Sequence, residues 1–484
     1  MILSDALAIL PLILLIVWAM IVLLIDLWIP KGRKGITALL TVIGLAVALV
    51  LTVMQANSPT SAFSGMIKVD GFSVFLNILY LASGIAGVAI SFDYLNRMDL
   101  QHGEYYVLML FSIAGAMLIS YAADLIIIFL GIELLSIPLY VLAGIARSQG
   151  SSEESSLKYF LLGTFASAFI LFGIAWLYGA GGTTNLAGLV TAIPDGLNSA
   201  GALPMLLAGA GFLVAGIGFK VAVVPFHAWM PDVYQGAPAP VTGFMSVVAK
   251  AAGFAALMRV LFIALTTETG DVTPVLAAIA LLTMIVGNVV AIAQSNLKRM
   301  LAYSSIANAG YLLMALVPYS NPAVQADSVA SALFYLAAYA LTSFGAWAVI
   351  TMMEKGEIQG SEFSDIAGLG KKNPLLAAAL SVMMLSFTGV PLTLGFWGKF
   401  YLFRTAIEGG FIWLAVAGLL TTLVSAYYYL RVVVMMFFRD GDPDLKYSFW
   451  ASTVVFFGAL GLVVLAFFPD MMFGLATKAV LLLK

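Results

Sequence analysis

The chain has 484 residues, of which 62% are hydrophobic and only 10% are charged. Apolar runs of about 20 residues recur along its whole length, which is typical of a helical protein that crosses a membrane many times. A net charge of −2 gives no indication of a nucleic-acid partner. The absence of cysteine excludes disulfides, cysteine-ligated zinc and cysteine-held iron–sulfur clusters.

Redox and hydrolytic centres are also not expected. The two histidines, His102 and His227, lie in unrelated segments, which argues against a bis-histidine haem. The sequence contains no nucleophile triad and no metal constellation, and the glycine-rich turn at 179–182 is not followed by the lysine and threonine of a phosphate-binding loop. We therefore expect no metal and no bound cofactor in this chain.

Fourteen apolar runs are predicted to cross the membrane. They are expected to be helices, because a helix satisfies its own backbone polar groups in lipid. The first apolar run is too long for a signal peptide and lacks a positive flank, so we expect it to be retained as a span. The spans are expected at residues 5–29, 35–55, 71–93, 104–121, 123–146, 156–179, 203–225, 240–265, 274–294, 300–318, 326–353, 374–405, 410–438 and 450–470.

The basic residues of the loops predict the orientation. With the N-terminus outside, the outer segments hold only Lys68, Lys478 and Lys484. This arrangement predicts a bacterial cytoplasmic (inner) membrane protein with both termini on the non-cytoplasmic side. The thirteen basic residues of the inner loops are Lys31, Arg33, Lys34, Arg97, Arg147, Lys158, Lys298, Arg299, Lys355, Lys371, Lys372, Arg439 and Lys446.

Several charges fall inside predicted spans, where they are costly and usually functional. Lys250 follows the start of its helix by about ten residues, which places it ~15 Å deep, half of a ~30 Å hydrocarbon core. Glu133 has a similar depth in the fifth span. Lys220 and Lys399 lie in the seventh and twelfth spans. Arg259, Arg404 and Arg431 lie toward helix ends, where snorkelling or local pairing is expected.

The seventh and twelfth spans are predicted to be discontinuous helices. Glycines and Pro225 interrupt the former around Lys220, and Pro391 with flanking glycines interrupts the latter just before Lys399. Interrupted helices in corresponding positions of inverted halves are typical of transport sites. We therefore expect a three-helix segment (1–103), a five-helix unit (104–265), a second, inverted five-helix unit (266–438) and a C-terminal helix (439–484).

Glu133 and Lys220 suggest a switchable ion pair, since each lowers the cost of the other's charge. Lysine suits a proton path because it can release its proton when buried, whereas arginine stays charged. The structural alternative is a static pair that locks two helices together. The presence of Lys250 and Lys399, with no other obvious acid at their depth, weakens that alternative.

Other polar residues are weaker candidates. His227 is a candidate for proton uptake, although a packed interfacial histidine explains it equally well. Asp232 is expected to be a helix cap or a loop ligand. The tyrosine runs 105–106 and 427–429 are expected to be interfacial aromatics. The polar residues of the tenth span either hold water between lysines or pack helices, and they are Tyr303, Ser304, Ser305 and Asn308.

These residues lie in motifs that resemble a known family. The motifs are LGIEL at 130–134, SLKYF at 156–160, FK at 219–220 followed by PFHAWMPDVYQGAP at 225–238, NLKRMLAYSS at 296–305, and GVP at 389–391 with GKF at 398–400. They are similar to the antiporter-like membrane subunits of bacterial NADH:quinone oxidoreductase (respiratory complex I), and the 231–238 version resembles the N-type subunits.

The resemblance implies a fourteen-helix fold with two inverted repeats and a proton relay. Glu133 and Lys220 would form the switch pair, Lys250 the central relay, and Lys399 the relay of the second half-channel. It also implies docking to an antiporter-like neighbour and to small K-, J- and A-type subunits, with NADH, FMN, iron–sulfur clusters and quinone held by other subunits. Two departures are a missing lateral amphipathic helix and no histidine in spans eight to twelve.

Three functions remain open from the sequence. The first is a proton-translocating, non-redox subunit of a quinone-reducing complex. The second is a stand-alone Mrp-type Na⁺(K⁺)/H⁺ antiporter subunit, a class that shares the fold and the same kind of intramembrane glutamate–lysine pair. The third, a structural spacer, is disfavoured because it has no reason to retain four costly buried charges.

Overall fold

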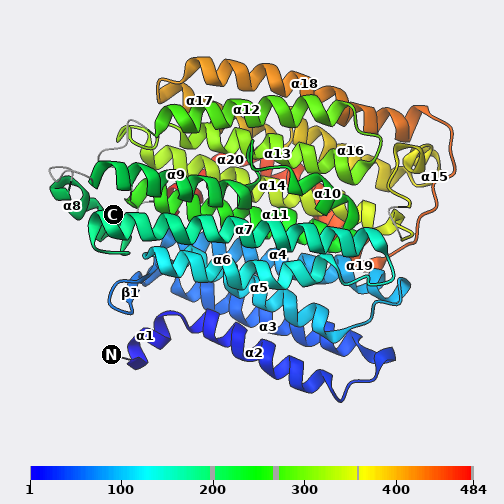
Figure 1. Ribbon diagram of the computed structural model, residues 1–484. Coiled ribbons are helices and arrows are strands. Elements are labelled where there is room, and N and C mark those ends of the chain that lie inside the picture. The colour runs from blue at the N-terminus through cyan, green and yellow to red at the C-terminus, as the bar shows by residue number, and fades with distance from the viewer. Residues whose placement is uncertain (1, 197–201, 265–271, 357–358, 481–484) are drawn as a thin grey trace.

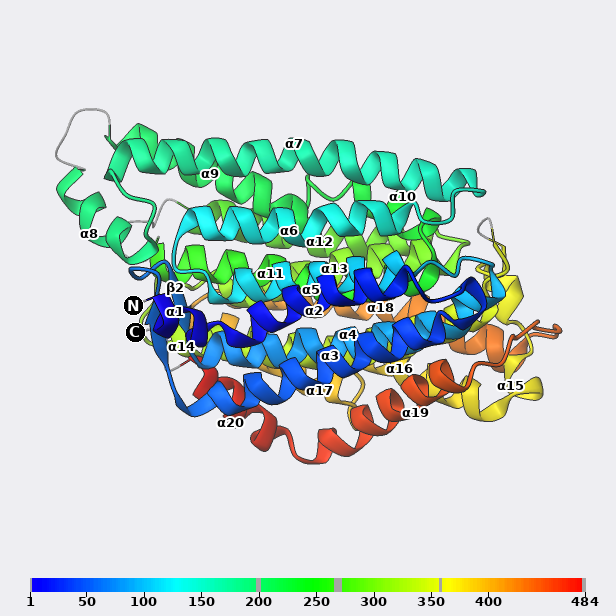
Figure 2. The ribbon, with the colours of Figure 1, turned by 90° about the horizontal axis from the view of Figure 1, so that it is seen from below.

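The computed structural model describes residues 2–196, 202–264, 272–356 and 359–480. Long helices run side by side along a common direction, with α18 and α12 on one side of the bundle and α2 on the other (Figure 1). Both termini lie at one end of the bundle, and α15 lies at the opposite end (Figure 2). A chain with both ends on one side of the bundle crosses it an even number of times.

The N-terminal segment packs α2, α3 and α4 together beside a small hairpin. Its first predicted span is two helices, because the chain is interrupted at Ile9 just before Pro11. Helix α4 begins at a capping box in which Asp70 and Ser73 satisfy each other's backbone amides. The elements are α1 (Ile2–Ala8), α2 (Leu10–Asp26), η1 (Lys31–Arg33), α3 (Gly35–Met54), η2 (Gln55–Asn57), the antiparallel pair β1 (Thr60–Ala62) and β2 (Ile67–Val69), and α4 (Gly71–Arg97).

The next part of the chain contains the first predicted interruption. Helix α9 ends at Val221 and α10 begins at Trp229, so the predicted break in the seventh span is confirmed. Pro225, which has no amide hydrogen to donate, lies in that break. The elements are α5 (Gly103–Tyr121), α6 (Leu125–Ala143), α7 (Gly150–Gly181), α8 (Leu186–Gly196), α9 (Ala202–Val221), α10 (Trp229–Gly236), α11 (Ala239–Arg259) and the short π-helical turn η3 (Val260–Ala264).

The second half contains the other interruption. Helix α16 ends at Thr388, where Gly389 caps it with a left-handed φ of +87°, and α17 begins at Leu394. The elements are α12 (Thr273–Ile292), α13 (Leu297–Leu316), α14 (Gln325–Met353), η4 (Phe363–Ile366), α15 (Leu369–Lys372), α16 (Pro374–Thr388), α17 (Leu394–Glu408), α18 (Ile412–Phe438), α19 (Phe449–Val464), η5 (Leu465–Phe467) and α20 (Pro469–Val480).

The predicted class, an all-helical protein with many membrane spans, is confirmed. Eleven helices of the described ranges are long and apolar enough to cross a membrane, and α2 and α16 are shorter apolar helices. The count of fourteen and the division into repeats therefore stay predictions. The expected boundary between the two five-helix units, at 265/266, lies outside the described residues, and so does Lys484. The sequence did not predict α8, α20 or the hairpin, because these segments are too short to show a clear apolar period.

The centre of the bundle consists of α11, α13 and α14. In α11 and α14, 89% of the apolar window is buried inside the protein, against 28% in the peripheral helices α18 and α19. Charged side chains on α11 therefore face other helices, while α18 and α19 present apolar side chains outward. This difference decides which intramembrane charges need partners inside the protein.

Candidate functional site

Lys220 lies at the end of α9, directly before the break in the seventh span. Its side chain is 8% exposed. The ammonium donates hydrogen bonds to the Ser136 hydroxyl and to the Tyr140 hydroxyl of α6, both at 3.0 Å. The chain can turn here because Ala222 adopts a left-handed φ of +57° and Pro225 follows in the loop. The broken helix thus presents a buried lysine to the polar side of α6.

Glu133 also lies on α6, but it does not pair directly with Lys220. The Glu133 carboxylate, which is half-buried, accepts a hydrogen bond from the Ser167 hydroxyl of α7. Among the described residues, no carboxylate oxygen lies within 4.0 Å of the Lys220 ammonium. The two charges thus have no direct contact in this structure, and the expected switch pair stays a prediction. Ser136, one turn after Glu133 on α6, binds the Lys220 ammonium.

Lys250 is buried in the middle of α11, as its depth predicted, with 2% exposure. Its ammonium donates hydrogen bonds to the hydroxyl and to the backbone carbonyl of Ser305 on α13. It also lies 5.2 Å from the centre of the Tyr339 ring on α14, and the Tyr339 hydroxyl donates to Ser305 at 2.9 Å. Hydroxyls and an aromatic face surround this amine, with no carboxylate among its described partners.

Lys399 occupies a similar environment in the second half of the chain. It lies on α17, is 4% exposed, and donates to the carbonyl of Thr388 at 3.1 Å. That carbonyl is at the free end of α16, where the helix dipole favours a cation. The ammonium also lies 4.7 Å from the centre of the Tyr311 ring. A Cβ at Gly389 would lie 2.9 Å from the Lys399 side chain, so glycine is needed there.

Helix α13 connects the Lys250 and Lys399 sites. Ser305, Asn308 and Tyr311 are spaced three residues apart, so they form one stripe along the helix. Ser305 contacts Lys250 and the Tyr311 ring contacts Lys399. Between them, the Asn308 side chain accepts a hydrogen bond from the Tyr335 hydroxyl at 2.6 Å. The stripe therefore places polar side chains of one helix face between two buried amines.

The other predicted residues of the tenth span differ in position. Ser304 is buried and lies 2.5 Å from the Tyr429 hydroxyl. Tyr303 is half-buried and contacts no polar group among the described residues, so the structure does not bring it to the stripe. Tyr428 and Tyr429 are each 1% exposed. The expectation that these two tyrosines are interfacial is therefore wrong, because α18 turns them into the protein.

His227 lies in the connection between α9 and α10. It is half-buried, and its Nδ1 atom is buried without a hydrogen-bond partner among the described residues. Asp232 lies on α10 and forms ion pairs, whereas a helix cap or a loop ligand was expected. It binds Lys158 and Arg299, both at 2.7 Å. Partial burial opposes the charge of Asp232, but the hydrogen bonds from Lys158 and Arg299 hold its pKa below the usual value.

Arg259 forms a buried ion pair that sequence reasoning missed. It was expected to snorkel or pair locally, but its side chain and that of Asp70 are both 0% exposed. The pair is bidentate, with distances of 2.8 and 2.9 Å, and Arg259 also donates to the Ser120 carbonyl at 2.7 Å. It joins α11 to the start of α4. The partners are 189 residues apart, so no local pattern could have indicated the contact.

Lys298 and Glu354 form a second buried pair that was missed. Lys298 was expected in an exposed loop, but it is 1% exposed and lies 2.5 Å from Glu354. Lys298 also donates to the Ala237 carbonyl at 2.7 Å, and Glu354 accepts from the Ala239 amide at 2.9 Å. The reason for the difference is that α13 begins at Leu297, inside the bundle. Arg404 pairs with Glu408 at 2.8 Å, which confirms its expected local pairing.

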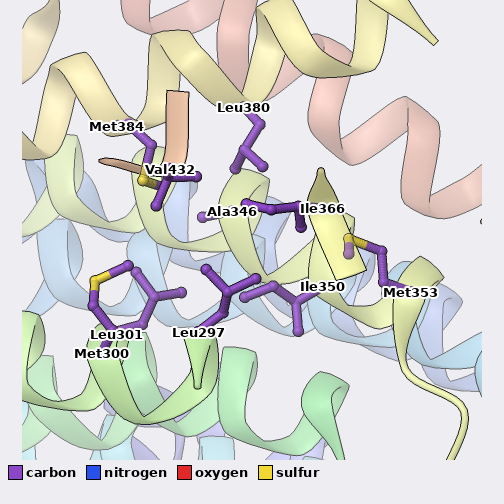
Figure 3. Close-up of a pocket in the computed structure, with 10 residues that line it drawn as sticks. All are labelled: Leu297, Met300, Leu301, Ala346, Ile350, Met353, Ile366, Leu380, Met384 and Val432. Atoms are coloured by element: carbon purple, nitrogen blue, oxygen red, sulfur yellow. The ribbon is translucent and has the colours of Figure 1, made fainter. Parts of the chain in front are cut away.

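The described residues hold no metal site. In the part of the chain that the structure describes, no group of three or more histidine or acidic residues could hold a metal ion. A small space of about 10 Å³ lies among α13, α14, α16 and α18. Figure 3 shows the apolar side chains that line it, such as Leu297, Met300 and Met384. A space this small with no polar partner does not hold water.

Comparisons with known proteins agree with this geometry. The family described as "NADH:quinone oxidoreductase/Mrp antiporter, TM" matches residues 122–425. The NADH-quinone oxidoreductase subunit N 2 of Roseiflexus castenholzii is 43% identical over 468 residues, or 96% of this chain and 94% of that protein. The subunit N of Trichlorobacter lovleyi is 43% identical over 482 residues, or 98% of this chain and 97% of that protein.

A solved structure gives the same result. A chain in the structure of respiratory complex I from Thermus thermophilus with bound aureothin is 35% identical and superimposes with a TM-score of 0.83. The match covers 96% of this chain and 99% of that chain. The sequence and the fold therefore point to one family. The chain belongs to the NADH:quinone oxidoreductase/Mrp antiporter transmembrane family, and within it to the N subunits of NADH-quinone oxidoreductase.

Proposed function

We propose that this chain is a non-redox subunit of a proton-translocating NADH:quinone oxidoreductase, and that it carries protons through the membrane arm of that complex. NADH oxidation and quinone reduction take place on other subunits, which hold FMN and iron–sulfur clusters. The chain has no cysteine to bind a cluster. Membership of the N-subunit family supports this assignment.

The observation that carries the proposal is the set of three buried lysines whose ammonium groups contact hydroxyls, carbonyls and aromatic faces. None of the three has a carboxylate within 4.0 Å among the described residues. An ammonium inside a membrane protein is costly, and a fixed structural role would favour a paired charge such as Arg259–Asp70. An unpaired lysine is suited to gaining and losing a proton.

The polar stripe on α13 gives these lysines a route for proton exchange. A proton on Lys250 can pass to Ser305, along hydroxyls, the Asn308 amide and water, and on to Lys399. Hydroxyl groups both donate and accept hydrogen bonds, so a chain of them carries a proton without becoming charged for long. Glu133 and Lys220 form the corresponding element in the first half, where Ser167 binds the carboxylate and Ser136 binds the ammonium.

The remaining expectations are part of the same proposal. The chain lies in a bacterial cytoplasmic membrane, and the bundle end that holds both termini faces away from the cytoplasm. The predominance of basic residues at the other end, for example Lys371 and Lys372 on α15, supports this orientation. The protein docks to an antiporter-like neighbour and to small K-, J- and A-type subunits, and its two five-helix units are inverted repeats.

The alternative is a stand-alone Mrp-type Na⁺(K⁺)/H⁺ antiporter subunit, since the matching family includes both kinds of protein. The N-subunit relatives at 43% identity over nearly the full chain favour the complex. A sodium path also calls for more carboxylates than the half-buried Glu133 that serves the lysine region. Sodium uptake by vesicles that contain this subunit separates the two functions.

The test is proton pumping by the assembled complex in vesicles, measured together with the rate of quinone reduction. We expect Lys220→Ala to lower both rates by about tenfold or more while the complex stays assembled, because a proton-transfer group is removed. Lys372→Ala, at an exposed ion pair, serves as the control. Pumping and quinone reduction at wild-type rates in the Lys220→Ala complex would refute the proposal.

A further inference from the structure

The end of α6, the start of α7 and their connection enclose an open groove of about 430 Å³. Arg147 and Glu153 line its charged rim, Leu157 and Phe160 its apolar wall, and Tyr140 its inner end. At ~30 Å³ per molecule of liquid water, this space has room for roughly a dozen waters. The end of α6 and the start of α7 lie at the bundle end opposite the termini, where α7 passes beside α10 (Figure 2).

Tyr140 belongs both to this groove and to the buried lysine site. It is 4% exposed, and its hydroxyl lies 3.0 Å from the Lys220 ammonium. The hydroxyl can reach this position because α7 has a glycine opposite it, where a Cβ at Gly163 would lie 2.2 Å away. Tyr159 stacks edge-on against the Tyr140 ring at 4.7 Å and fixes its plane.

The surroundings of the groove favour proton collection. Beside its rim, Lys158 bridges Glu154 and Asp232 at 2.7 Å each, so several exposed groups that exchange protons lie together. The route along α13 from the same end is different. There Leu297, Met300 and their neighbours line the small apolar space of Figure 3. The groove beside α6 has charged and hydroxyl side chains in its lining, so it is the better of the two spaces for holding water.

We propose that the groove between α6 and α7 is the hydrated mouth through which protons reach Lys220, and that the Tyr140 hydroxyl is the last carrier. The inference rests on the proposed function. Once Lys220 has passed its proton onward, its neutral amine accepts the Tyr140 hydroxyl proton, and the tyrosine oxygen takes a proton from hydronium in the groove. One N–H bond and one tyrosine O–H bond form, while the original tyrosine O–H bond and one O–H bond of hydronium break. Hydronium is left as water, Lys220 carries the charge, and Tyr140 ends neutral.

The first test blocks the groove chemically in the assembled complex. Because the native chain has no cysteine, Leu157→Cys places a single thiol of this chain on the groove wall. Leu161→Cys, one turn further along α7 and outside the groove, is the matched control, since the two leucines are 58% and 56% exposed. The probe is a membrane-impermeant cationic methanethiosulfonate, and the complex without either substitution gives the background from other subunits.

We expect the probe to label Leu157→Cys and to lower pumping and quinone reduction by at least about twofold, with Leu161→Cys keeping its unlabelled rates. The second test is Tyr140→Phe, which keeps the ring and removes the hydroxyl, and we expect it to lower pumping by about tenfold or more. Tyr159→Phe, a buried tyrosine of the same cluster that does not bond Lys220, is its control and is expected to pump normally.

Three results would overturn the inference. They are failure of the probe to label Leu157→Cys, normal pumping after labelling, and normal pumping by Tyr140→Phe. If Lys220→Ala stops pumping while a labelled groove does not, only the groove is refuted. If the Lys220→Ala complex pumps normally, both the groove inference and the proposed function are refuted.

Discussion

Replacing Asp70 by asparagine isolates the cost of an unpaired buried charge. Asparagine caps a helix about as well as aspartate, so the hydrogen bond from the Ser73 amide at 2.8 Å can remain. Arg259, at 0% exposure, loses its bidentate carboxylate and keeps the Ser120 carbonyl and the Phe72 ring at 4.8 Å. Leaving one member of a buried ion pair unpaired costs about 3–5 kcal/mol.

That free energy lowers the ratio of folded to unfolded subunit by about two to four orders of magnitude. The contact joins α4 to α11, which carries Lys250, so the loss should appear as reduced assembly. The assay is the amount of assembled complex and its rate of thermal inactivation in membranes. Asp70→Ala should be worse by a further ~0.5–2 kcal/mol, because it also removes the cap.

The double variant Asp70→Asn/Arg259→Gln is the control, since it removes both charges. We expect it to recover most of the lost assembly, because a neutral pair avoids the isolated buried charge. The reasoning is refuted if Asp70→Asn assembles and inactivates like the wild type. It is equally refuted if the double variant is no better than the single one.

Three further predictions follow from the other contacts. Ser305→Ala removes one hydroxyl partner of Lys250 but leaves the backbone carbonyl, so pumping should fall several-fold with normal assembly; unchanged pumping would contradict the α13 route. Gly389→Ala introduces backbone strain of about 1–2 kcal/mol and also displaces the Lys399 side chain. Gly410→Ala is the control, because Gly410 also has a positive φ of +90° but an added Cβ there has no neighbouring atom within 4 Å. Only Gly389→Ala should therefore slow pumping. Lys298→Ala leaves the Glu354 carboxylate buried without its ammonium partner and should cost about 3–5 kcal/mol in stability. The loss is measured by thermal inactivation, and the double variant Lys298→Ala/Glu354→Ala should be more stable than the single variant.

The sequence predicted that the lysines inside the spans are buried, but it missed the buried ion pairs Arg259–Asp70 and Lys298–Glu354. Helix depth placed Lys250 inside the bundle, and glycine and proline positions predicted both interrupted helices. These are local properties, because 1.5 Å per residue fixes depth and a missing amide fixes a break. The membrane class follows from composition for the same reason.

Partners depend on which helix faces touch, and this information is not local. Glu133 and Lys220 have no direct contact, because Ser167 binds the carboxylate while Ser136 and Tyr140 bind the ammonium. Tyr140 and Tyr339, which contact Lys220 and Lys250, carried no signal, since a tyrosine in an apolar run is equally typical of a membrane interface.

The most direct test of the proton-relay account is Lys250→Met in the assembled complex. Methionine fills a similar volume without a charge, and Lys371→Met, at an exposed lysine, is the matched control. Proton pumping is measured in vesicles beside the rate of quinone reduction and the amount of intact complex. The account predicts that Lys250→Met lowers pumping by about tenfold or more with normal assembly. Pumping at the rate of Lys371→Met would contradict it and would leave Lys250 as a structural residue.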